Sequence, residues 1–191
     1  MSQQRALELI RQAKQTSARR LNLSDLELTE LPPEIGELTE LRVLWMAGNR
    51  LETLPPEIGR LRQLQSLRLE DNRLTALPPE IGQLMELRRI TLHKNRLTGF
   101  PAEFWQLHKL QRLITAGNQI ETLPDGIGRL ANLQELKFGG WYPKWGMFLG
   151  NQLSELPPVI AELKNLQSLD LSSNQLSELP PVIAELKNLQ S

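Results

Sequence analysis

A repeat of 23 residues is the feature that most constrains how this chain folds. The unit reads LxxLxLxxNxLxxLPPEIGxLxx, after a degenerate leading copy whose inward residues are Leu21, Leu23 and Leu28. Its full copies begin at Leu41, Leu64, Leu87, Leu110, Leu133 and Leu166. A single unit of this size cannot bury its own apolar face, so neighbouring units must stack. The sequence therefore predicts a curved rod of about seven stacked units.

Each unit contains signals for one strand and one helical turn. The LxL alternation, as at Leu67 and Leu69, has period two and predicts a short strand with its leucines turned inward. The proline pair, as at Pro55 and Pro56, fixes φ and favours an extended entry into a first helical turn. We therefore expect an α/β solenoid, with parallel strands on the concave face and short helical or 3-10 segments on the convex face.

An asparagine follows the strand in six of the units. A side-chain amide at this turn can satisfy the backbone groups that the bend leaves unpaired inside the stack, which predicts a structural role. Leu26 takes its place in the leading copy, so that turn should be less regular. The asparagines are Asn49, Asn72, Asn95, Asn118, Asn151 and Asn174.

The two ends of the chain differ. Residues 1–17 form an amphipathic helical pattern that includes Ala6, Leu7, Ile10 and Ala13, and they are expected to cap the first unit. A helix that binds a partner is the alternative. The solenoid follows over 18–191, and its last residues begin an eighth unit without a comparable cap. We expect an open strand edge there, through which two chains could form a homodimer.

Residues 151–168 and 174–191 are identical, as NQLSELPPVIAELKNLQS. Such identity indicates a recent duplication, an engineered copy or a shortened longer array. The sequence alone does not choose among these three origins.

An insert interrupts the period at 141–150, with the sequence WYPKWGMFLG. It holds Trp141, Tyr142, Trp145 and Phe148, and insertions in solenoids project as loops from one face. Tryptophan and tyrosine are frequent hot spots of interfaces, so the insert is a candidate contact surface. The alternative is that the loop folds back and packs its rings on the solenoid, because exposed apolar clusters lower solubility. Both interpretations can hold together.

The residues that flank the inward leucines should form columns on the concave face. One column contains Trp45 and Ile114, two large apolar side chains at exposed positions. Ala47–Gly48 and Ala116–Gly117 lie beside them and would leave room for a group of a partner. Alternatively, Arg68 on the next strand covers Trp45 through a cation–π contact. The column runs through Asn22, Trp45, Arg68, Thr91, Ile114, Lys137 and Asp170.

A neighbouring column contains Arg20, Arg89 and Arg112, which makes the middle of the face locally basic and suited to an acidic segment of a partner. The alternative is that nearby carboxylates pair with these cations, in which case the charges contribute little. The candidate carboxylates are Glu70, Asp71, Glu135 and Asp170.

Composition excludes several other functions. Lys plus Arg equals Asp plus Glu at 22 each, so no net field favours nucleic acid or a membrane. The chain has no cysteine, no apolar leader and no long apolar run, which predicts a cytoplasmic protein. His93 and His108 are the only histidines and fall on different faces, so we expect no metal site, cofactor or catalytic centre and interpret His93 as a surface residue.

The repeat pattern resembles the leucine-rich repeats of Ras-interacting scaffolds, Scribble-like proteins and bacterial repeat proteins. The opening, ALELIRQAKQTSARRLNLSDLELTELPPEIG, is similar to that of bacterial repeat proteins, including the repeat region of Roco proteins, where a GTPase domain follows. The resemblance implies a leucine-rich-repeat horseshoe that binds a protein partner without catalysis. Alternatives are a regulatory arm of a larger Roco-like protein and an engineered or truncated array without a partner. The predicted partner-binding residues are Trp45, Arg68, Arg89, His93, Arg112, Ile114, Trp141, Tyr142 and Trp145.

Overall fold

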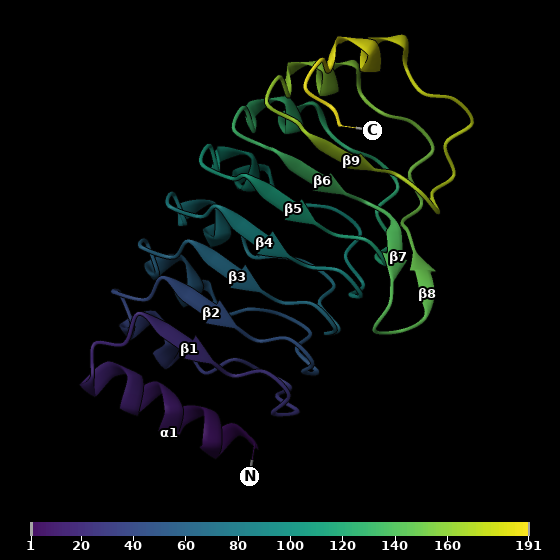
Figure 1. The fold of residues 1–191 in the computed structure, drawn as a ribbon. Coiled ribbons are helices and arrows are strands. Elements are labelled where there is room, and N and C mark those ends of the chain that lie inside the picture. Colours follow the sequence, from purple (N-terminus) through teal and green to yellow (C-terminus); the bar gives the residue numbers. More distant parts are fainter. Residues whose placement is uncertain (1, 191) are drawn as a thin grey trace.

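The computed structural model describes residues 2–190 as one curved solenoid (Figure 1). An α-helix, α1 (Ser2–Gln15), precedes a parallel sheet of seven strands in the order β1-β2-β3-β4-β5-β6-β9. The strands are β1 (Arg20–Asn22), β2 (Val43–Trp45), β3 (Ser66–Arg68), β4 (Arg89–Thr91), β5 (Arg112–Ile114), β6 (Glu135–Lys137) and β9 (Ser168–Asp170). A separate antiparallel hairpin consists of β7 (Gly140–Tyr142) and β8 (Met147–Leu149).

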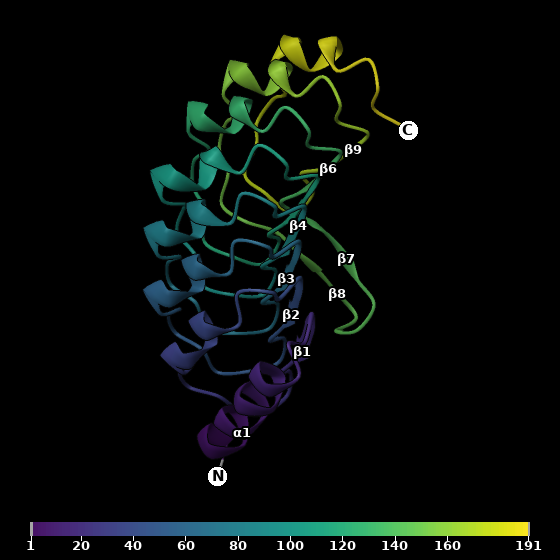
Figure 2. The same cartoon turned by 90° about the vertical axis from the view of Figure 1, so that its left-hand side faces the viewer.

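A 3-10 helix follows each strand of the large sheet and returns the chain along the opposite face (Figure 2). Each begins after a proline, whose fixed φ suits the first turn, and the N–H of the leucine at its end donates to the carbonyl of the central Ile or Phe. The helices span Pro33–Glu37, Pro56–Arg60, Pro79–Gln83, Ala102–Gln106, Asp125–Arg129, Pro158–Glu162 and Pro181–Glu185. The predicted layers of strands and short helical segments are therefore confirmed.

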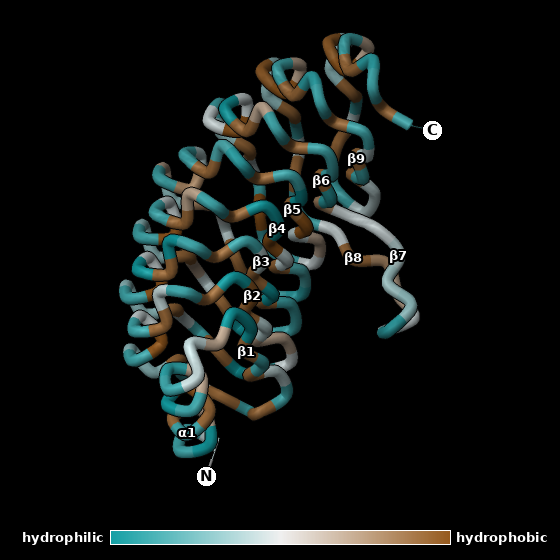
Figure 3. The backbone as a smooth tube through the Cα atoms, turned by 60° about the vertical axis from the view of Figure 1, so that its left-hand side comes forward, coloured by the Kyte–Doolittle hydropathy of each residue, from teal (hydrophilic) through white to brown (hydrophobic). Residues whose placement is uncertain are grey.

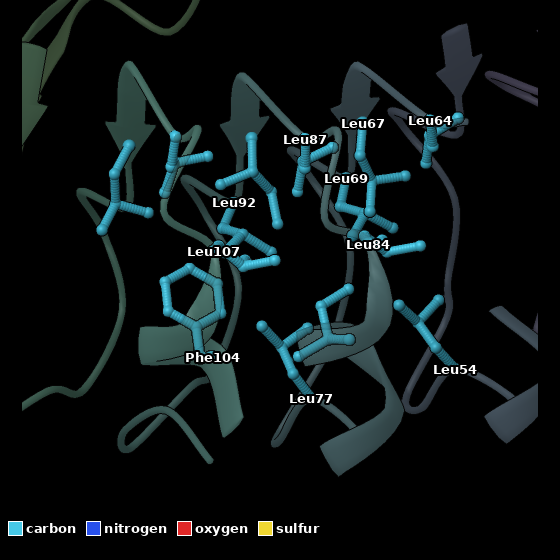
Figure 4. Close-up of a cluster of buried hydrophobic side chains, with 14 of the residues drawn as sticks. Leu54, Leu64, Leu67, Leu69, Leu77, Leu84, Leu87, Leu92, Phe104 and Leu107 are labelled. Atoms are coloured by element: carbon cyan, nitrogen blue, oxygen red, sulfur yellow. The ribbon is translucent and has the colours of Figure 1, made fainter. Parts of the chain in front are cut away.

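The core lies between these two layers and runs the length of the rod. Leu67 and Leu69 are fully buried, as are Leu87 and Leu92 in the next unit, and Phe104 packs among them from the helical side (Figure 4). Hydrophobic and hydrophilic segments of the tube alternate within every coil (Figure 3). Each unit thus completes its neighbour's core, as the repeat requires.

The asparagines form a ladder through the stack, which confirms their predicted structural role. In Asn72, Nδ2 donates to the carbonyls of Met46 and Leu69 at 2.9 and 3.0 Å, and Oδ1 accepts from the N–H of Leu51 at 3.1 Å. Each amide therefore joins its own turn to the preceding unit. Asn174, near the end of the stack, is only half-buried.

The turn before the asparagine requires a left-handed residue, such as Asp71 or Lys94, each at φ 58°. In the leading copy two residues of the turn, Asp25 and Glu27, have positive φ, so this turn is less regular, as expected. The Oδ1 of Asn49 accepts from the N–H groups of both Leu26 and Leu28. The first asparagine of the ladder therefore belongs to the second unit, but it also satisfies backbone groups of the first turn.

Helix α1 covers the start of the stack. Ala6, Ile10 and Ala13 are buried against the first unit, Leu7 is half-buried, and Lys14 forms an ion pair of 2.6 Å with Glu37. The predicted N-terminal capping helix is thus confirmed. Across residues 2–190, no helix combines the length and apolar character needed to cross a membrane.

Candidate interaction surface

The strand register places the predicted columns on the concave face. Asn22, Trp45 and Arg68 are consecutive partners on β1, β2 and β3, and the same column continues through Thr91 to Ile114 on β5. The neighbouring column runs Arg20, Val43, Ser66, Arg89 and Arg112. The alternation of buried leucines with outward side chains therefore builds this surface directly from the repeat.

A shallow hollow of about 260 Å³ lies where these two columns cross β1 to β5. Its floor contains Val43, Trp45 and Ser66, and arginines surround it. Trp45 is half-buried, and among residues 2–190 no cation lies over its ring, so the cation–π alternative with Arg68 is wrong. The hollow is lined by Arg20, Val43, Trp45, Ser66, Leu67, Arg68, Arg89, Thr91 and Arg112.

Three of the four arginines around this hollow keep their charge free of ion pairs. Within the described residues, Arg20, Arg68 and Arg89 lie in no salt bridge, whereas Arg112 pairs with Glu135. Glu135 also pairs with Lys137, at 3.0 Å. The alternative in which carboxylates neutralise the basic residues therefore applies to the β5–β6 end of the face and not to β1–β4.

Glu70, Asp71 and Asp170 lie near the opposite ends of the strands. Asp71 forms an ion pair of 2.8 Å with Lys94, and Glu70 accepts a hydrogen bond from the Thr91 hydroxyl. Asp170 accepts from the backbone N–H and hydroxyl of Ser172 at 3.0 and 2.6 Å. Over β1–β4, Arg20 and Arg89, which have no ion pair within residues 2–190, therefore lie at the strand starts, and carboxylates engaged by Thr91, Lys94 and Lys144 lie toward the strand ends. On β6, by contrast, Glu135 takes the arginine column.

Two basic residues of this region were missed from the sequence. Arg19 and Arg42 are exposed beside Arg20 and Val43, one position before the arginine column, and Arg88 takes the same place before β4. The columns predicted from the sequence lie only within the strands. The second residue of each unit lies just before its strand, and such residues line the concave face together with the arginine column. These arginines extend the basic surface over the starts of the strands.

The insert folds back toward the N-terminal end on the strand side of the rod (Figure 2). β7 leaves the sheet directly after β6, and the hairpin returns at Leu149 to the asparagine turn. Lys144 Nζ at its tip lies 3.7 Å from the carboxylate of Asp71, which belongs to the turn after β3. The hairpin therefore crosses more than one unit of the stack.

One face of the hairpin packs its rings on the solenoid. The ring centroids of Tyr142 and Trp145 lie 4.8 and 5.5 Å from that of His93, and Lys94 Nζ lies 4.4 Å from the Trp145 centroid. These contacts join aromatic rings to each other and to a cation, and they hold the hairpin on the turns that follow β3 and β4. The interpretation that the insert packs its rings on the solenoid is confirmed.

The other face of the hairpin remains open. Trp141 and Phe148 are directly opposite each other on β7 and β8, with ring centroids 5.1 Å apart, and are 52% and 61% exposed. A cross-strand aromatic pair stabilises a hairpin, but it does not require this much accessible apolar surface. The insert thus combines a docked face with an exposed aromatic face, as the two interpretations together predicted.

The room that we expected beside Ile114 is filled. A Cβ placed on Gly117 would lie 3.3 Å from side-chain atoms of Leu149, which fill the space beside the glycine. The N–H of Gly117 donates to the Gly150 carbonyl at 2.6 Å. Ala116 is fully buried beneath them. The predicted pocket at this place is wrong, because the base of the insert occupies it.

The corresponding room beside Trp45 is filled as well. A Cβ on Gly48 would lie 2.0 Å from the carboxylate of Asp25, which occupies that space, and Gly48 has a φ of 66°. The usable hollow lies on the arginine side of Trp45 instead. Neither of these local contacts follows from the repeat pattern.

His93 is half-buried under the rings of Tyr142 and Trp145, so the expectation of an open surface histidine is wrong. Burial lowers its pKa, and the lysines Lys144 and Lys94 act in the same direction, while the carboxylates of Glu70 and Asp71 oppose them. The His93 Nδ1 and the Tyr142 hydroxyl are buried and form no hydrogen bond within residues 2–190. Burial also raises the pKa of Tyr142 to about 12. This junction therefore favours a neutral imidazole.

Lowering the pH should weaken the docking of the hairpin. Because the docked state depresses the pKa of His93, its contribution to docking is full above the ordinary value of 6.5 and is lost as the pH falls below it. We expect tryptophan fluorescence to report increasing exposure of Trp145 as the pH is lowered from about 7.5 to 5. His93→Gln should abolish this transition and His108→Gln should retain it; identical profiles for all three proteins would contradict the assignment.

The described residues contain no group of three or more His, Asp or Glu side chains arranged to hold a metal ion. The two histidines are separated, with His93 under the hairpin and His108 exposed on the helical side, where its Nδ1 lies 3.4 Å from the carbonyl of Arg129. The features that gather on one surface are an indole, a row of arginines and an aromatic hairpin. This arrangement is suited to recognition of another molecule.

Comparison with known proteins agrees with this architecture. A family model described as leucine-rich repeat region matches residues 58–142, and a second, leucine rich repeat, matches 40–61 and 165–186. A leucine-rich-repeat protein of Leptospira interrogans is 36% identical, with a TM-score of 0.69 over 92% of this chain and 48% of its own. No curated protein matches the sequence.

Two further solved structures share the fold. The ectodomain of the Arabidopsis thaliana membrane receptor kinase GASSHO1/SCHENGEN3 is 30% identical, with a TM-score of 0.77 over 93% of this chain and 21% of its own. An internalin of Listeria monocytogenes is 20% identical, with a TM-score of 0.66 over 94% of this chain and 55% of its own. This chain thus spans about half the length of the bacterial proteins and about a fifth of the plant one. Strand register, asparagine ladder and family models together show that the chain belongs to the leucine-rich-repeat proteins.

Proposed function

We propose that this chain is a non-catalytic protein-interaction module that binds its partner on the concave face. The observation that carries the proposal is the hollow around Trp45, where a half-buried indole lies among arginines that have no ion pair within residues 2–190. Keeping such groups together on an open surface has no evident structural benefit, whereas tryptophan and arginine are the side chains that most often dominate interfaces.

The hairpin lies beside this surface, on the turns that follow β3 and β4. Tyr142 and Trp145 hold it in place, which leaves Trp141 as the residue of the insert best placed to contact a partner, together with Phe148. His93, placed under the hairpin, contributes to a partner site by positioning these rings. Arg112, paired with Glu135, and half-buried Ile114 extend the surface toward β5.

The solved relatives support this proposal. The plant ectodomain was crystallised in complex with CASPARIAN STRIP INTEGRITY FACTOR 2, so a protein of this fold and 30% identity carries a ligand. A role as a regulatory arm of a larger Roco-like protein would use the same surface and stays a prediction. A cytoplasmic location and a homodimer through the edge of β9 also stay predictions.

A matched capture experiment tests the proposal. The wild-type chain and the variant Trp45→Ala/Arg89→Ala/Arg112→Ala are used to capture proteins from cytosol of the source cell, which mass spectrometry identifies. The control variant Met85→Ala/Arg60→Ala/Arg129→Ala removes one exposed apolar and two basic side chains from the helical side. We expect a partner that the wild type and the control retain and the concave variant loses by about tenfold or more.

Circular dichroism establishes that both variants remain folded. Equal capture by all three proteins would contradict binding at the concave face. Absence of any specific partner would instead favour an array that has none, as the identical final segments of the chain allow.

A further inference from the structure

The arginines around the hollow have a spacing that restricts what can bind there. Arg20 on β1 and Arg89 on β4 occupy the same column, with Val43 and Ser66 between them. Adjacent strands lie about 4.8 Å apart, so the two arginines are separated by three strand spacings, or about 14 Å. Val43 and Ser66 between them are uncharged, and Trp45 and Arg68 border them on the neighbouring column.

An extended polypeptide matches this spacing. It advances about 3.3 Å per residue, so residues four positions apart are about 13 Å apart, and they project from the same side of the chain. The residue midway between them projects from that side too. A segment lying across the strands can therefore present two side chains to Arg20 and Arg89 while its central side chain meets Val43 and Trp45.

The charges determine which side chains those are. Arg20, Arg68 and Arg89 have no carboxylate partner within residues 2–190, and a guanidinium recognises a carboxylate through two parallel hydrogen bonds. The carboxylates of Glu70 and Asp71 lie near the opposite ends of the strands, where Thr91, Lys94 and Lys144 engage them. Acidic groups bound at the strand starts would therefore meet cations without meeting these carboxylates.

We propose that the concave face over β1–β4 binds an extended protein segment with two acidic residues four positions apart and an apolar residue midway between them. This inference rests on the proposed function, because it names the chemistry of the partner at the same surface. A protein segment is favoured over nucleic acid because uncharged Val43 and Ser66 lie between the two arginines and Trp45 borders them. This surface suits an apolar side chain between two charges, whereas a nucleic-acid backbone carries a charge at every unit.

Selection from a random nine-residue peptide library displayed on phage tests the proposal. The wild-type chain is expected to enrich the pattern acidic-x-apolar-x-acidic. A fluorescent synthetic peptide of the selected sequence should bind about tenfold more weakly to Arg20→Gln/Arg89→Gln, and within about twofold of wild type to the control Arg60→Gln/Arg62→Gln. Moving one acidic residue by a single position should weaken binding by about fivefold, because that side chain then projects from the other side.

Selected peptides without this acidic spacing, or peptides whose affinity is unchanged by Arg20→Gln/Arg89→Gln, would overturn the proposal. A single-stranded oligonucleotide that binds the wild type more tightly than the selected peptide would also overturn it. If the selected peptides are apolar and lose binding with Trp45→Ala, this inference fails while the proposed function stands. Failure of the selection would likewise reject the acidic pattern, and the capture experiment would then decide the proposed function separately.

Discussion

Replacing Asn95 by alanine is expected to lower the free energy of unfolding by about 3 to 5 kcal/mol. Its Nδ2 donates to the carbonyls of Leu69 and Leu92, both at 2.9 Å, and its Oδ1 accepts from the N–H of Leu74 at 2.9 Å. Alanine would leave the buried N–H of Leu74 without a partner. It would also remove one of the two amide donors from each of the Leu69 and Leu92 carbonyls, which keep those of Asn72 and Asn118. Urea unfolding followed by circular dichroism measures the change.

Asn174 provides the matched control, because it has the same place in its unit but is only half-buried. Its amide donates to the Leu171 carbonyl at 2.9 Å, and water can replace part of what alanine removes. Asn174→Ala should therefore cost about 1 kcal/mol. If Asn95→Ala and Asn174→Ala lowered the free energy of unfolding equally, burial of an asparagine would not determine how much it contributes to stability.

The repeat pattern was sufficient to predict the sheet and its surface columns. Because every unit places its strand at the same positions, the pairing of Trp45 with Arg68, and of Arg89 with Arg112, follows from the period alone. The inward leucines and the asparagine turn follow for the same reason. These features depend on contacts between equivalent positions of adjacent units, which a periodic sequence specifies directly.

The features that break the period could not be predicted in the same way. Nothing in WYPKWGMFLG specifies that Tyr142 and Trp145 pack on His93, which lies two units earlier in the stack. The occupation of the space beside Gly48 by Asp25 is likewise a contact between nonequivalent positions. The columns showed which side chains share the face, but the aromatic hairpin and the Asp25 contact determined which parts of it stay open.

A second departure from the repeat is a compensating pair of substitutions in the helical layer. Where the preceding units have a glycine, such as Gly59 or Gly82, the fourth unit has Trp105, which is buried. A Cβ on Gly59 or Gly82 would lie 2.8 or 2.7 Å from the Cβ of the glutamate in the next unit, so these two interfaces admit only glycine. At the interface between the fourth and fifth units the glutamate position holds Gly126 instead, and the indole lies over it.

Restoring glutamate at position 126 alone should therefore be strongly destabilising. A Cβ on Gly126 would lie 2.4 Å from Cδ1 of Trp105, and the fully buried Phe104 beside it limits movement of the indole. We expect Gly126→Glu to lower the free energy of unfolding by about 3 kcal/mol, and Trp105→Gly by about 3 to 5 kcal/mol because it leaves a cavity.

The double variant Trp105→Gly/Gly126→Glu restores the glycine–glutamate pair found at the preceding interfaces, so the two losses should not add. We expect it to be more stable than Trp105→Gly alone, with a coupling free energy of at least about 2 kcal/mol in a double-mutant cycle measured by urea unfolding. The control is Gly128→Ala, whose Cβ would lie no closer than 3.2 Å to the next unit and which should cost less than about 1 kcal/mol. Additive losses would show that Trp105 and Gly126 are independent, and that the glycine at 126 is not there to accommodate the indole.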